Sequence, residues 1–92
     1  MQQFHLFISG DVQGVGFRYF IRSKAKKHQV TGWVRNLAGG KVEAVLQGDR
    51  ENIEKIIHAS WEGPFLAKIK DIEVSEEEIT EIYEKLETRP TI

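Results

Sequence analysis

The fold can be worked out from residues 4–25, FHLFISGDVQGVGFRYFIRSKA. In residues 4–8 every second side chain turns the same way and is apolar, which is the period of a strand buried on one face. In residues 17–25 the apolar side chains recur at helical spacing, with lysine and arginine between them. Residues 10–16, which contain three glycines, therefore form a glycine-rich loop that joins a strand to a helix.

The same two periodicities predict the elements that follow this unit. The predicted elements are a strand at residues 30–36, a hairpin connection at 37–40, a strand at 42–46, a helix from 49 to 61 and a strand at 69–74. Gly63-Pro64 is a typical helix stop. The apolar alternation slips between Ile69 and Ile72, which indicates a β-bulge.

The predicted order is strand, helix, strand, strand, helix, strand. This is the split βαβ plan of an α+β fold, with both helices on one face of an antiparallel sheet. The tail is open to two interpretations. Ser75 and Glu78 form a capping box, and the apolar residues between 79 and 86 recur at helical spacing, so the local pattern favours a helix.

Length and composition limit the class of protein. Ninety-two residues fit one domain spanning residues 1–92, and 40% hydrophobic with 29% charged residues is typical of a globular chain. The chain contains no cysteine, which excludes a disulfide framework and a thiolate nucleophile and fits the reducing cytoplasm. Residues 4–8 are too short for the core of a signal peptide and have no basic lead-in, so we expect no export.

The charge balance limits the partners. A net charge of −1 and a pI of about 6.3 do not suit a nucleic-acid binder, and no segment is long enough to be a membrane span. No long apolar segment requires a partner subunit, and we expect a monomer. RNA binding on the sheet is a further alternative, but the basic and aromatic RNP1 pattern of such domains is absent.

Residues 10–18, GDVQGVGFR, carry the most informative chemistry. A glycine-rich turn that opens a helix lets several backbone N–H groups converge on one point, where the helix dipole also favours an anion. Arg18 can add a bidentate contact to a phosphate, and a bound anion explains an arginine that otherwise opposes the helix dipole. Glycines between a strand and a helix often serve only the turn, so these residues alone indicate an anion site and nothing more specific.

Residues 10–18 resemble the signature of the acylphosphatase family, in which a glycine, Val-Gln-Gly-Val and an arginine recur at these spacings. Residues 32–36, GWVRN, resemble the second signature of that family at the expected interval, and the likeness covers nearly the whole chain. The resemblance implies a ferredoxin-like fold with a short fifth strand near residues 86–89, in place of the local helix. It also implies hydrolysis of a small-molecule acyl phosphate by water, without a cofactor or metal.

The resemblance assigns roles to individual residues. It implies that Arg18 binds the phosphate and that Asn36 positions the attacking water. It further implies that the phosphate oxygens are held by the backbone amides of Gly14, Val15, Gly16, Phe17 and Arg18.

The residue types suit this reaction. Val12 stands six positions before Arg18, where cysteine-dependent phosphatases carry their nucleophile, so a phosphocysteine intermediate is excluded. The acidic residues are scattered without metal-site spacing, and His5, His28 and His58 are better explained as structural or solvated residues. A site without a general acid suits an acyl phosphate, because a carboxylate whose conjugate acid has a pKa of about 4.3 leaves unprotonated.

A non-catalytic module with the same fold is the main alternative, because acylphosphatase-like domains also occur inside larger carbamoyl-transfer proteins. The presence of both Arg18 and Asn36 in what we expect to be a free-standing chain favours catalysis.

Overall fold

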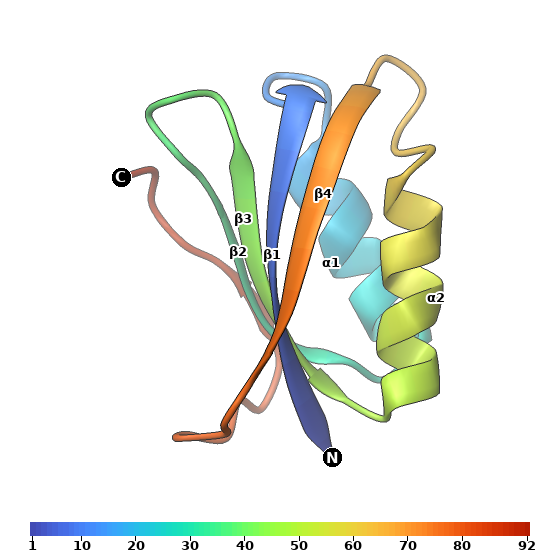
Figure 1. Ribbon diagram of the computed structural model, residues 1–92, viewed down its shortest axis with the longest axis vertical. Helices are drawn as coiled ribbons and strands as arrows, with labels where there is room; N and C mark the ends of the chain where they lie inside the picture. Colours follow the sequence, from blue (N-terminus) through green and yellow to red (C-terminus); the bar gives the residue numbers. More distant parts are fainter.

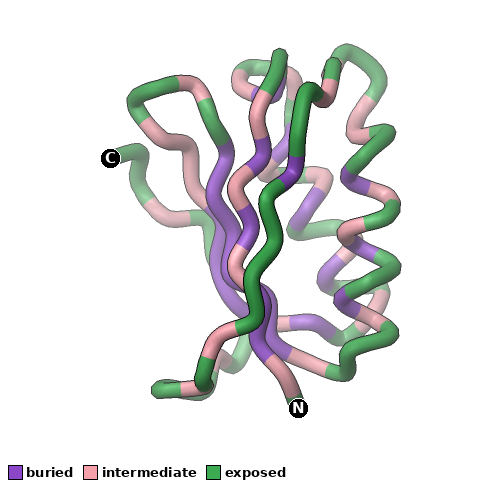
Figure 2. Tube along the Cα trace, viewed as in Figure 1, coloured by how far each residue is buried: buried purple, intermediate pink, exposed green.

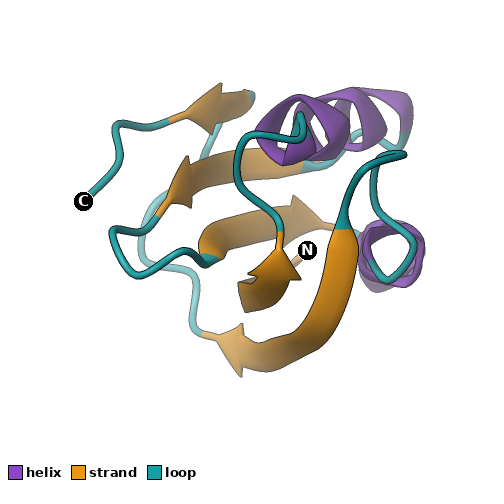
Figure 3. Ribbon diagram, turned by 90° about the horizontal axis from the view of Figure 1, so that it is seen from above, coloured by secondary structure: helices purple, strands orange, loops and turns teal.

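The computed structural model describes all residues from Met1 to Ile92 and confirms the α+β class. Both helices cover one face of a five-stranded sheet (Figures 1 and 3). The elements are β1 (Gln2–Asp11), α1 (Phe17–Lys27), β2 (Thr31–Asn36), β3 (Val42–Gly48), α2 (Arg50–Ser60), β4 (Lys68–Glu77) and β5 (Leu86–Thr88). The strands lie in the order β4-β1-β3-β2-β5. With 11 residues each, α1 and α2 are too short to span a membrane.

Strand β3 lies between β1 and β2 and pairs antiparallel with both. Strands β1 and β2 therefore run in the same direction, and their carboxyl ends reach the same edge of the sheet. Val42, at the start of β3, faces Ile8 on one side and Asn36 on the other. The loop after β1 and the end of β2 are thus only two strand spacings apart, about 10 Å.

The remaining pairings add two details to the predicted sheet. Strands β1 to β4 are antiparallel as predicted, whereas β5 pairs parallel with β2, so the whole sheet is mixed. The predicted bulge is confirmed. Ser9 faces Asp71 while Gly10 faces Ile69, which leaves Lys70 as the extra residue of β4.

The core lies between the sheet and the two helices. Leu6 and Ile8 of β1 are fully buried, as are Ile21 of α1 and Ile53 and Ile56 of α2. Figure 2 shows buried positions along the central strands and on the helix faces turned toward them. Each such side chain stabilises the fold by roughly 1.5–3 kcal/mol relative to exposure, and this burial holds α1 against the sheet.

The helix that the local pattern favours after Ser75 does not form, and the prediction based on it is wrong. Strand β4 continues to Glu77, and the implied fifth strand is present as β5. Between them the backbone bonds to a buried side chain of β3. The Gln47 amide donates to the Glu81 carbonyl oxygen at 2.6 Å and accepts from the Tyr83 N–H at 3.1 Å. The helical spacing of the apolar residues is overridden because these tertiary hydrogen bonds hold the segment in an irregular, non-helical conformation.

The sheet face away from the helices carries a cluster of charged side chains around His5. Its Nδ1 lies 2.7 Å from a Glu77 carboxylate oxygen, and its Nε2 lies 2.6 Å from Glu43. Arg35 donates from Nε to the other oxygen of Glu43 at 2.7 Å. Burial by itself lowers the pKa of His5, but hydrogen bonds and Coulomb attraction from Glu77 and Glu43 outweigh it and raise the pKa above 6.5. The hydrogen bond from His5 in turn lowers the pKa of Glu77.

This cluster predicts a pH-dependent stability. Because the His5 pKa is raised in the folded state, its contribution is complete below the unfolded value of 6.5 and is lost as the pH rises above it. We expect urea denaturation to show a falling free energy of unfolding from pH 6.5 upward in the wild type, and no such fall from this source in His5→Gln. His58→Gln, on exposed α2 surface, should retain the fall. A wild-type profile that is flat over this range would contradict the prediction.

Candidate functional site

A hollow of about 320 Å³ lies at the edge of the sheet where β1 and β2 end. Its lining residues are Val12, Gly14, Gly16, Arg18, Tyr19, Arg22, Asn36 and Thr88. The structure therefore brings Arg18 of α1 and Asn36 of β2 to one site, although 18 positions separate them in the sequence. Figure 1 shows the loop before α1 and the β2–β3 hairpin at the same end of the molecule.

The loop between β1 and α1 has a backbone that favours glycine. Gly14 and Gly16 have φ angles of 75° and 82°, in the left-handed region. An added Cβ at either position would meet no atom within 4 Å, so the requirement comes from the backbone conformation and not from crowding. The same open space leaves the loop backbone accessible from the hollow.

The backbone N–H groups of this loop have no acceptor inside the protein. The first bond of α1 runs from the Phe20 N–H to the Gly16 carbonyl oxygen at 2.9 Å, and none of the N–H groups from Gly14 to Tyr19 donates within the chain. No side chain caps the helix, and its first turn contains no acidic residue. Successive free donors at the positive end of a helix form an anion-binding arrangement.

The residues that we expected to form this arrangement divide into two groups. Gly14, Gly16 and Arg18 line the hollow. Phe17 is buried in the core and Val15 packs against it, so these two residues can offer only their backbone N–H groups to a ligand.

Gln13 connects the two halves of the site. Its side-chain amide donates to the carbonyl oxygens of Leu37 at 2.7 Å and of Lys41 at 2.9 Å. The hairpin that follows Asn36 is therefore attached directly to the loop that precedes Arg18. Sequence reasoning gave Gln13 no role of its own, although a long amide side chain among valines and glycines is a usable signal.

Three polar residues that line the hollow were also missed. Arg22 lies one helical turn beyond Arg18, and this spacing could have identified it. Tyr19 is largely exposed, which leaves its hydroxyl free, and its position gives no comparable signal. Thr88 reaches the hollow only because β5 aligns with β2, with Val34 opposite Thr88.

The chemistry of the hollow is set by two guanidinium groups, one carboxamide and two hydroxyls. No histidine and no carboxylate lines it. Such a site can bind and orient an anion and a water molecule, but it has no carboxylic acid or imidazole to transfer a proton.

Comparison with known proteins gives a consistent result. Residues 4–88 match the family model described as Acylphosphatase. An acylphosphatase of Chloroflexus aurantiacus is 50% identical over 76 residues, which cover 83% of this chain and 83% of that protein. The crystal structure of acylphosphatase from Bacillus subtilis superposes with a TM-score of 0.93 at 34% identity, and the match covers 97% of this chain and 99% of that one. Full-length HypF in its phosphate- and nucleotide-bound form matches at a TM-score of 0.89 and 33% identity, but only over 12% of its length.

The geometry of the hollow predicts that inorganic phosphate binds to it. We expect phosphate to raise the melting temperature of the wild type, because binding to the folded state alone stabilises it by mass action. In Arg18→Ala this phosphate-induced increase should disappear or shrink by at least about half, since a charge-assisted contact is lost. Arg50→Ala removes the same charge from α2 and should keep the full increase. An equal increase in all three proteins would show that phosphate does not bind at this loop.

Proposed function

This chain belongs to the acylphosphatase family of hydrolases acting on acid anhydrides, and we propose that it hydrolyses acyl phosphates by direct attack of water. The products are a carboxylate and inorganic phosphate. One observation carries the proposal: a single hollow combines free loop N–H groups, Arg18 and Asn36, and contains no carboxylate and no imidazole.

In this proposal the loop and Arg18 bind the phosphoryl group. The N–H groups from Gly14 to Arg18 donate hydrogen bonds to the phosphoryl oxygens, and the Arg18 guanidinium offers two parallel donors. Donors that are already in place stabilise the charge of the transition state without reorganisation. This requirement gives a reason for an arginine in a first turn that has no acidic residue.

Asn36 orients the attacking water. Its backbone is held on both sides, because it pairs with Val42 of β3 and its carbonyl oxygen accepts from the Ile92 N–H at 3.3 Å. A carboxamide can hold a water molecule but cannot deprotonate it. An oxygen of the substrate phosphate takes the proton as the new P–O bond forms.

The leaving group explains why this small set of residues is sufficient. When the P–O bond to the acyl oxygen breaks, the electron pair leaves on a carboxylate, whose conjugate acid has a pKa of about 4.3. A phosphate ester would release an alkoxide and would need an acid that this hollow lacks. The site therefore favours acyl phosphates over phosphate esters.

The proposal includes a cofactor-free, monomeric and cytoplasmic enzyme. No group of three histidine or carboxylate side chains is arranged to hold a metal ion, which supports catalysis without one. No long apolar segment requires a partner subunit, and the absence of cysteine suits a reducing compartment.

The likeness to HypF keeps a second candidate function open to test, namely a phosphate-binding module that catalyses nothing. The presence of Asn36 beside Arg18 favours the enzyme, because binding alone does not need a group that orients water.

Release of inorganic phosphate from benzoyl phosphate tests the function. We expect turnover that survives exhaustive treatment with EDTA, because no metal takes part. p-Nitrophenyl phosphate, a phosphate ester, should be hydrolysed more slowly by several orders of magnitude. Absence of turnover would favour the phosphate-binding module that catalyses nothing. Activity that is lost with EDTA and restored by Mg²⁺ would refute the metal-free mechanism.

Substitution of Asn36 separates catalysis from binding. In Asn36→Ala we expect kcat to fall by about 10²–10³, the usual cost of a lost catalytic amide. The phosphate-induced increase in melting temperature should remain, since the loop and Arg18 are intact. Asn52→Ala removes the same group from α2 and should leave kcat unchanged. Near-normal kcat in Asn36→Ala would remove this residue from the mechanism.

A further inference from the structure

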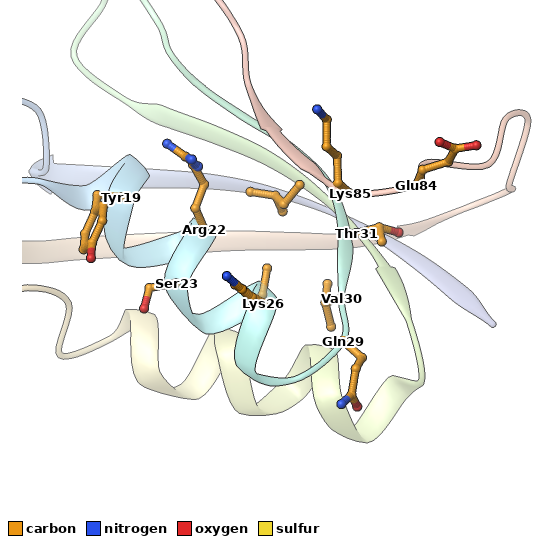
Figure 4. Close-up of a pocket in the computed structure, with 11 residues that line it drawn as sticks. Tyr19, Arg22, Ser23, Lys26, Gln29, Val30, Thr31, Glu84 and Lys85 are labelled. Atoms are coloured by element: carbon orange, nitrogen blue, oxygen red, sulfur yellow. The ribbon is translucent and has the colours of Figure 1, made fainter.

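A second and larger hollow, of about 800 Å³, adjoins the first. Tyr19 and Arg22 line both hollows, so the two share a wall. Figure 4 shows the second hollow between α1 and the segment that leads into β5, with Val30 and Thr31 between them. We call this hollow the α1–β5 groove.

The α1 wall of the groove continues a row of cations that begins in the phosphate site. Arg18, Arg22 and Lys26 occupy every fourth position of α1, and each step rises about 6 Å along the helix. Like charges at this spacing destabilise a helix. The residues of α1 include no aspartate or glutamate, and neither Arg22 nor Lys26 forms an ion pair. Helix α2, in contrast, pairs Arg50 with Glu54 at the same spacing.

The opposite wall adds a third cation to the groove. Lys85 is exposed and also lacks an ion-pair partner, and its carbonyl oxygen accepts from the Gly32 N–H at 3.1 Å, which holds its backbone to β2. Glu84 is the single carboxylate of the lining, against Arg22, Lys26 and Lys85. In Figure 4 the side chains of Arg22 and Lys26 extend from α1, and Lys85 lies on the segment across the groove.

The lining of the groove also contains apolar residues. Ala25 and Val30 are buried core residues that also line it, and Leu86 is partly buried against the core. A carbon chain or ring can therefore lie along the groove while the cations meet charged groups at its rim. A volume of this size accommodates far more than an acetyl group.

We propose that the α1–β5 groove binds the acyl half of a substrate that carries a second anionic group, such as a carboxylate or a phosphate. This inference rests on the proposed function, because it requires the transferred phosphoryl group to lie against Arg18. Lys26 and Lys85 then act as specificity-determining residues, and Arg22 serves both hollows.

Two rigid substrates of equal size test the proposal. 4-Carboxybenzoyl phosphate carries a second anion, and 4-carbamoylbenzoyl phosphate is its neutral counterpart. The quantity measured is the ratio of their kcat/KM values. Because the chemical step is the same in every variant, electronic differences between the two rings cancel when ratios are compared.

The ratio should fall by about fivefold in Lys26→Gln/Lys85→Gln, since each exposed contact contributes modestly. Lys55→Gln/Lys70→Gln makes the same change of net charge outside the groove and should keep the wild-type ratio. Equal ratios in all three proteins, with turnover intact, would contradict the proposed role of the groove and leave the proposed function standing. Absence of turnover of both substrates by the wild type would instead refute the proposed function.

A second measurement on the wild type avoids any effect of the substitutions on folding. 4-Carboxybenzylphosphonate and 4-carbamoylbenzylphosphonate are stable analogues of the two substrates. We expect the carboxyl compound to inhibit more strongly, and its advantage to shrink as salt is added, because exposed charges are screened. An advantage that is absent or independent of salt would contradict the proposal.

Discussion

The position of β3 between β1 and β2 is the constraint on which the site depends. Because β3 is antiparallel to both, the chain leaves β1 and β2 at the same edge of the sheet. Val42 of β3 pairs with Ile8 near the end of β1 and with Asn36 at the end of β2, so the two strand ends lie level with each other. The loop between β1 and α1 and the Asn36 carboxamide are therefore placed by backbone hydrogen bonds and the buried core, and the Gln13 amide joins this loop to the β2–β3 hairpin.

Helix α1 has an apolar face that packs in the core and a charged face that lines the two hollows. Phe17, Ile21 and Ala25 are buried against the sheet and fix the position of the helix. The adjacent face, one position further along the chain, carries the unpaired cations Arg18, Arg22 and Lys26, an arrangement that destabilises the helix. A structure that keeps such a row beside two connected hollows suits anionic ligands, and the burial of the apolar face supplies the stability that the charged face does not.

The predictions from local pattern succeeded where one face of an element is buried and failed where it is not. The β1 alternation and the α1 spacing both match the observed burial, because each of these elements packs one face on a single core. The family expected from residues 10–18 and 32–36 is confirmed. The segment after Ser75 has helical spacing but lies on the exposed side of the sheet, where hydrogen bonds to Gln47 decide its conformation.

Periodicity along the chain was enough to predict the strand–loop–helix unit and the split βαβ order, and the glycine-rich turn before Arg18 was enough to predict an anion site. Asn36 became a candidate through the resemblance of residues 32–36 to the family's second signature. Only the tertiary structure decided that Gln13 joins the two halves of the site, that Thr88 completes the hollow and that Lys85 faces α1 across a groove. Each of these contacts joins residues more than 20 positions apart, and strand pairing and register, which are set by the whole core, bring them together.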